Sequence, residues 1–192
     1  GIEALKAVWH RGAVDADGKT GDGAGIHVEI PKDFFIEKVE VTGHTYDNSE
    51  ICVGMIFLPR NDYAAQENCK TIVESELTKN DFSIYGWRQV PVNPKVLGEK
   101  AFQTMPEIIQ VLFKSNNPEL LNKDLERKIY ETRRIIENKA FQISLNNFYI
   151  CSLSSKSIIY KGMFLAEAIS EFFLDLKDER FVSRYAIFHQ RF

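Results

Sequence analysis

The chain has 192 residues, of which 44% are hydrophobic and 27% charged, a balance typical of a soluble globular protein with one sizeable core. Lys and Arg number 24 against 27 Asp and Glu, and the resulting net charge of −3 excludes a strongly basic, nucleic-acid-binding protein. No apolar stretch reaches the length of a membrane span. The three cysteines indicate reduced thiols, so we expect a cytoplasmic protein.

The first predicted element is an amphipathic helix that is already under way at residue 1. Ile2, Leu5 and Trp9 fall at helical spacing. The helix is expected to end near Gly12, because glycine readily adopts the left-handed backbone conformation that terminates many helices. The last predicted strand runs to the final residue. Because domain boundaries normally fall in exposed linkers, we expect the chain to be a fragment.

A glycine-rich loop follows at Asp15–Gly25 and leads into an alternating strand at 26–30. A dinucleotide fingerprint needs a strand before the glycines and a helix after them, and here the order is reversed. Taken alone, the loop therefore favours a structural turn over a ligand site.

The rest of the chain mixes strands and helices. Apolar or alternating runs predict strands at 51–58, 82–90, 107–114, 148–153, 157–160 and 184–192. Helical spacing predicts helices at 62–79, with Tyr63, Ile72, Val73 and Leu77 on the inner side, at 117–138 and at 162–174. The turn 154–156 is typical of a hairpin. The pattern predicts one α+β domain with mostly antiparallel sheets.

The densest basic stretch, Lys123–Arg134, alternates with acidic residues and predicts a solvated helix face. The cysteines are Cys52, Cys69 and Cys151, and their spacing does not form a metal knuckle. Cys52 and Cys151 lie in apolar runs, so we expect buried, reduced and inert thiols. An internal cysteine nucleophile, with a base among histidines 10, 27, 44 and 189, is the less favoured alternative. We expect no metal site.

Two arginine motifs stay ambiguous on spacing alone. His10-Arg11-Gly12 could simply complement the dipole at a helix C-terminus. Arg191, in the run Ala186–Phe192, needs an anionic partner if its strand is half-buried. That partner could be a structural carboxylate or the carboxylate of a bound amino acid, held by two parallel hydrogen bonds.

Three ordered runs together carry a family resemblance. They are Gly1–Leu5 with His10–Ile26, then Ile159–Glu167, and finally Asp178–Phe181 with Ala186–Phe192. In this order they resemble the N-terminal part of glutamate synthase large subunits. The resemblance covers the whole chain.

The resemblance implies that residues 1–192 are a partial type 2 glutamine amidotransferase domain. The implied fold is the four-layer αββα sandwich of N-terminal nucleophile hydrolases, here incomplete. In that class a mature N-terminal cysteine attacks the side-chain amide of glutamine, and its own α-amino group acts as the base. By resemblance that cysteine is expected before Gly1 and an Asn-Gly oxyanion hole after Phe192. We therefore expect the stretch itself to be inactive.

The resemblance also assigns residues to the site. Arg191 matches the arginine that clamps the α-carboxylate of glutamine, and Phe192 stands where an aromatic residue follows it. Arg11 and Gly12 match the active-site wall beside the nucleophile. No internal cysteine matches the nucleophile.

The implied substrate is L-glutamine, and the ammonia would travel through a tunnel to reductively aminate 2-oxoglutarate. The implied partners are the remaining domains of the large subunit, which carry FMN and an iron–sulfur cluster, and a small NAD(P)H-oxidising subunit or ferredoxin. No cofactor is expected in this domain. A non-catalytic amidotransferase-like module for docking or regulation is one alternative. A second alternative is that the chain belongs to another class II amidotransferase.

Overall fold

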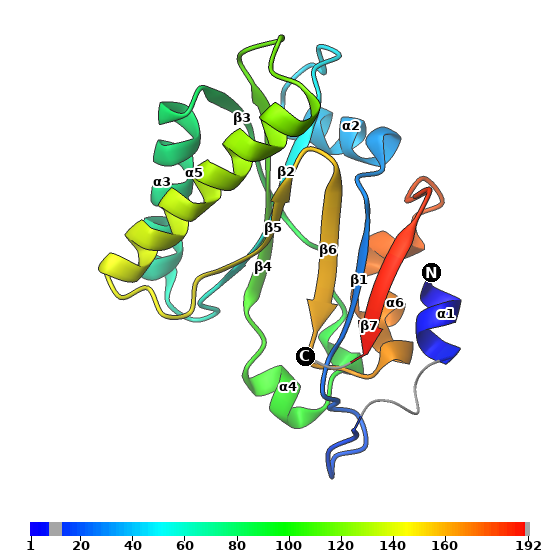
Figure 1. The fold of residues 1–192 in the computed structure, drawn as a ribbon. Helices are drawn as coiled ribbons and strands as arrows, with labels where there is room; N and C mark the ends of the chain where they lie inside the picture. The colour runs from blue at the N-terminus through cyan, green and yellow to red at the C-terminus, as the bar shows by residue number, and fades with distance from the viewer. Residues whose placement is uncertain (8–12, 191–192) are drawn as a thin grey trace. The chain divides into compact units, whose positions relative to one another are not determined.

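The computed structural model describes residues 1–7 and 13–190, and their contacts fall into two compact units (Figure 1). The first unit is built from Gly1–Pro31, Val90–Met105 and Ile159–Phe192, and the second from Lys32–Gln89 and Pro106–Ile158. The assignment of the whole chain to a single domain stays a prediction. Within the described part of the chain, no helix is both long and apolar enough to cross a membrane.

The second unit contains a four-stranded antiparallel sheet in the order β3-β4-β2-β5. Its strands are β2 (Cys52–Leu58), β3 (Phe82–Gln89), β4 (Glu107–Ser115) and β5 (Tyr149–Ser154). The continuous apolar run of β2 predicts burial on both faces, and all but one of its residues are buried. This strand is central, between β4 and β5.

Two long helices cover one face of this sheet, where α3 (Tyr63–Lys79) and α5 (Asn122–Gln142) lie side by side (Figure 1). Asp62 begins α3 by accepting a hydrogen bond from the Ala65 N–H at 2.9 Å. A core cluster joins the helices to the sheet and includes Val73, Ile129 and Phe113. The shorter α2 (Lys32–Val41), which the sequence pattern did not reveal, buries Phe34 and Phe35.

The first unit contains a three-stranded sheet in the order β6-β1-β7. Its strands are β1 (Ala24–Glu29), β6 (Ser157–Gly162) and β7 (Ala186–Gln190), and β1 pairs with β7 antiparallel. The other elements are short: α1 (Ile2–Ala7), η2 (Pro94–Val96), α4 (Glu99–Gln103), η3 (Ala166–Ala168), α6 (Ile169–Phe172) and η4 (Leu174–Lys177).

An aromatic cluster forms the core of this first unit. Its members are Tyr160, Phe164, Phe172, Phe173 and Phe181, whose neighbouring rings lie 4.8 to 6.0 Å apart. Most of these pairs meet edge to face, the arrangement that the ring quadrupole favours. The Tyr160 hydroxyl donates to the buried Asp175 carboxylate at 2.9 Å.

The predicted α+β class with antiparallel sheets is confirmed, and it is consistent with the N-terminal nucleophile hydrolase fold. The predicted helix at 162–174 is wrong, because this stretch breaks into η3, α6 and the start of η4. The backbone there bonds to another segment instead: Asn93 N–H donates to Phe172 O and Leu174 N–H to Pro91 O. Packing of the phenylalanines has overridden the helical periodicity.

Three smaller predictions also differ from the structure. The turn 154–156 does not join a hairpin, because β5 pairs with β2 in one sheet and β6 lies beside β1 in the other. Tyr63 is not on the inner side of its helix and is 77% exposed, whereas Val73 and Leu77 are buried as predicted. The predicted helix at 117–138 begins later, at Asn122.

Candidate functional site

The pairing of β1 with β7 brings the end of the last strand against the end of the glycine loop. Gln190 lies opposite Ala24, and His189 lies opposite Gly25. The other end of the pair is also fixed, because Glu29 N–H donates to the Ser183 hydroxyl at 2.9 Å. The chain that leads into Arg191 is therefore held on a strand rather than a loop.

His189 packs directly over Gly25. A Cβ atom at position 25 would lie 2.8 Å from His189 Nε2, closer still to its Cε1, and 2.9 Å from the Cβ of Lys161. Only glycine leaves room for this approach. Partial burial lowers the pKa of His189, and the positive charge of Lys161 lowers it further. Both effects favour the neutral form of the imidazole.

The glycine loop itself is a small hairpin. Val14 and Gly21 form an antiparallel bridge, and the Asp15 N–H donates to Thr20 O at 2.9 Å. Gly18 at the tip has φ of 70° and Gly23 has φ of 113°, which is backbone that side chains rarely adopt. The structural-turn reading of this loop is thus supported by its own geometry.

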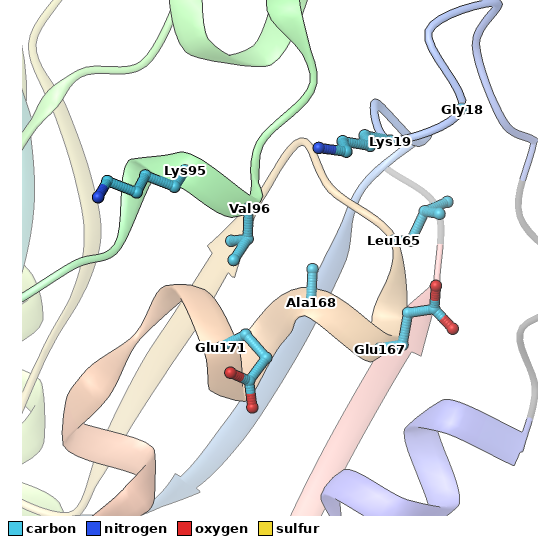
Figure 2. Close-up of a pocket in the computed structure, with 8 residues that line it drawn as sticks. All are labelled: Gly18, Lys19, Lys95, Val96, Leu165, Glu167, Ala168 and Glu171. Atoms are coloured by element: carbon cyan, nitrogen blue, oxygen red, sulfur yellow. The ribbon is translucent and has the colours of Figure 1, made fainter.

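A shallow hollow of about 370 Å³ opens beside the hairpin tip (Figure 2). Val96, Leu165 and Ala168 line its apolar part. Its charged rim consists of Lys19, Lys95, Glu167 and Glu171. Glu171 is paired with Lys177 at 2.7 Å. Its lining includes no cysteine, serine or histidine.

The three cysteines are all buried and belong to the second unit. Cys52 lies on β2, Cys69 on α3 and Cys151 on β5. Burial raises the pKa of Cys69 to about 11, and burial also raises the pKa of Cys52 well above its ordinary value. His27 and His189 lie on the other sheet. The burial predicted for Cys52 and Cys151 is found, whereas the choice against an internal cysteine nucleophile stays a prediction.

The predicted site residues Arg11, Gly12, Arg191 and Phe192 lie outside the described residues, as does His10. Their roles stay predictions. Among the described residues, no group of three His, Cys, Asp or Glu side chains could hold a metal ion. The assignment of FMN and an iron–sulfur cluster to other domains stays a prediction.

Comparison with known proteins identifies the class. The sequence profile described as "Glutamine amidotransferases class-II" matches residues 1–192, and the chain belongs to this family.

Within this family, the chain is similar to glutamate synthases. The chain is 56% identical, over all of its length, to the glutamate synthase [NADPH] large chain of Azospirillum brasilense. It is 40% identical over 98% of its length to ferredoxin-dependent glutamate synthase 1 of Arabidopsis thaliana. The chain spans 13% of the first relative and 12% of the second. The resemblance inferred from the three motifs is confirmed.

Sequence reasoning missed a contact at the hairpin tip, where Asp17 and Thr20 meet the segment around Gly98. The local half of this contact carries a signal, because an aspartate three residues before a threonine is typical of a turn closed by its own side chain. The other half comes from a segment nearly eighty positions away in the chain, as the numbering shows. The spacing of residues in the sequence does not indicate that the segment around Gly98 is the partner.

Proposed function

We propose that this chain is the glutaminase part of a glutamate synthase, which hydrolyses L-glutamine to glutamate and ammonia. The observation that carries the proposal is the family match across residues 1–192 together with 56% identity to a glutamate synthase large chain. In the complete protein, the ammonia would reductively aminate 2-oxoglutarate in another domain.

In this proposal Arg191 holds the α-carboxylate of glutamine with two parallel hydrogen bonds. The pairing of Gln190 with Ala24 supports this role, because it holds the residue before Arg191 on a strand beside the glycine-rich segment. Such placement on a rigid element is what a substrate clamp needs. Arg11 and Gly12 would form the adjacent wall.

The attacking thiol would come from a cysteine other than Cys52, Cys69 and Cys151, because all three are buried. The thiolate attacks the amide carbon of the glutamine side chain, and a thioester forms as ammonia leaves. Water then attacks the thioester, which releases glutamate and restores the thiol. The atoms balance as glutamine plus water giving glutamate plus ammonia.

The electron donor of the complete protein is a separate proposal. Identity is higher to the relative named for NADPH than to the one named for ferredoxin, 56% against 40%, which favours a small NADPH-oxidising subunit as partner. Supplying each donor in turn to the complete protein and measuring glutamate formation tests this. Turnover with reduced ferredoxin alone would contradict it.

Arg191→Lys in the complete protein tests the clamp. Lysine keeps the charge but presents a point donor instead of a planar fork, so we expect the KM for glutamine to rise roughly tenfold or more with a smaller change in kcat. Steady-state glutamate release measures both constants. An unchanged KM would remove Arg191 from the substrate site. A complete protein that never hydrolyses glutamine would instead support a non-catalytic docking or regulatory module.

A further inference from the structure

The long helix α5 is basic, although the chain as a whole is acidic. Its 21 residues include six Lys or Arg and four Asp or Glu, which gives the helix a net charge of +2, whereas the whole chain has a net charge of −3. The sequence predicts a solvated face for this basic stretch. The contacts of the individual side chains show which of these charges the protein neutralises itself.

Two of the four carboxylates of α5 are engaged within the second unit. Glu126 accepts hydrogen bonds from the Ser155 N–H at 2.7 Å and from the Ser155 hydroxyl at 2.8 Å. Glu137 pairs with Arg133 at 2.8 Å and also contacts Arg134. These two acids therefore do not balance the cations nearer the start of the helix.

Five exposed side chains form a stripe along the side of α5 that faces away from its buried residues. They follow one another at steps of four, three, four and seven positions, which places them on one side of an α-helix. The members are Lys123, Arg127, Tyr130, Arg134 and Phe141, and we call them the α5 stripe. Tyr130 is 60% exposed and Phe141 is 82% exposed.

Two cations of the α5 stripe are not neutralised by the protein. Lys123 and Arg127 form no ion pair with any residue in the part of the chain that the structure describes. The two remaining acids of the helix, Asp124 and Glu131, are exposed and lie on the flank of the stripe. The stripe thus presents two aromatic rings among cations that lack a counter-charge.

This combination of side chains is typical of a surface that contacts another protein surface. Aromatic residues and arginine are enriched where proteins meet, and they contribute much of the binding energy there. Burial of Tyr130 and Phe141 would remove apolar surface from water. Lys123 and Arg127 require carboxylates across the contact. The complementary surface is therefore acidic and has an apolar centre.

The length of the relatives indicates where this complementary surface lies. The chain spans 13% of the Azospirillum large chain and 12% of the Arabidopsis protein. A symmetric contact between two copies of the α5 stripe is disfavoured, because it would bring like charges together. We propose that the α5 stripe docks against an acidic surface with an apolar centre on another domain of the same polypeptide. This inference rests on the proposed function only for the length of the complete protein.

Hydroxyl-radical footprinting of the complete protein tests the docking. Mass spectrometry gives the oxidation rate of each aromatic side chain, corrected for the intrinsic reactivity of tyrosine or phenylalanine. Tyr63 is the matched control, because it is 77% exposed and lies in the same unit but on α3. We expect Tyr130 and Phe141 to be oxidised at least about fivefold more slowly than Tyr63, because the contact excludes water from both rings.

Charge reversal tests the chemistry of the partner. Arg127→Glu should raise the oxidation rates of Tyr130 and Phe141 at least about threefold and leave Tyr63 unchanged, because the new carboxylate faces an acidic surface. Lys19→Glu is the control, since it makes the same change of net charge at an exposed position of the first unit. It should leave all three rates as in the wild type. If Arg127→Glu yields no folded protein, Lys123→Glu carries the same comparison.

The proposal is overturned if Tyr130 and Phe141 are oxidised as fast as Tyr63 in the wild-type protein. It is also overturned if Arg127→Glu has no more effect than Lys19→Glu, since the contact would then not depend on charge. Protection that disappears on dilution would place the partner on another molecule and contradict the proposal. Glutamate release is measured on the same samples. A protected protein that releases no glutamate refutes the proposed function alone, and an active protein without protection refutes the docking alone.

Discussion

The unreactive state of the three cysteines can be tested directly with a thiol reagent. Cys52 and Cys69 are 0% exposed and Cys151 is 4% exposed, so a disulfide reagent cannot reach their sulfur atoms without local opening of the second unit. The perturbation is a large excess of reagent applied to native protein at pH 8, followed by the same treatment in denaturant.

The magnitude follows from burial of Cys69. Its pKa is raised from 9.0 to about 11, a difference of two units. At pH 8 the thiolate fraction is therefore about a hundredfold smaller than for the same thiol in water, and the thiolate is the reactive species. Burial of the sulfur slows the reaction further. The free energy of local opening then sets the rate.

The assay follows release of the coloured thiol from the reagent, with peptide mapping to assign each modified cysteine. We expect all three to react in seconds in denaturant and to react at least about a hundredfold more slowly in the native protein. Rapid modification of any one of them in the native state, with loss of glutamine hydrolysis, would refute the argument that the nucleophile is not among them.

Three further predictions follow from single contacts. Gly54→Ala should destabilise the protein by about 1–3 kcal/mol, because its Cβ would lie 2.6 Å from Val111 Cγ1 in a central strand. Adding Val111→Ala to Gly54→Ala should recover part of the lost stability. Urea unfolding measures the free energies of unfolding, and a double variant whose loss equals the sum of the two single losses would contradict the prediction. Glu76→Gln should cost stability at pH 7 but little at an acidic pH at which the carboxyl group of Glu76 is protonated in the folded protein. The lysine contacts of Glu76, Lys139 first, lower its pKa below 4.5, so the stabilisation is present above that value and is lost as pH falls through the lowered pKa. Equal losses at both pH values would contradict this assignment. Gly25→Ala should raise the KM for glutamine in the complete protein several-fold, because the added methyl group collides with the His189 ring and displaces the strand that leads to the clamp. A KM equal to that of the wild type would show that this strand does not position the substrate.

Much of the fold could be predicted because its strands bury continuous or alternating apolar runs. The strand at 51–58 was found from its apolar run alone, and β2 occupies Cys52–Leu58. The helix predicted at 162–174 failed for a tertiary reason. The backbones of Phe172 and Leu174 bond to a segment some eighty residues earlier in the chain, and sequence periodicity carries no information about such partners.

For the candidate site, too, one part could be predicted from the sequence and another part could not. The family could be inferred because a long, ordered set of residues resembles it, and the comparisons confirm that family. The role of Arg191 in the site stays a prediction. The contact of Asp17 and Thr20 with Gly98 was not predicted, because it depends on the absence of a side chain at Gly98 and on a fold that brings Asp17 to it. A glycine that gives room to a distant loop looks, in one sequence, like any other glycine.

We propose that this chain binds glutamine for attack by a thiol other than Cys52, Cys69 and Cys151. It is tested most directly by treating the complete protein with diazo-oxo-norleucine, a glutamine analogue that alkylates an attacking thiolate, and mapping the label by mass spectrometry. We predict one label per chain, blocked by excess glutamine, on a cysteine other than Cys52, Cys69 and Cys151, and labelling slowed by Arg191→Lys. Labelling of one of these three, or no glutamine-protected label at all, would contradict the account.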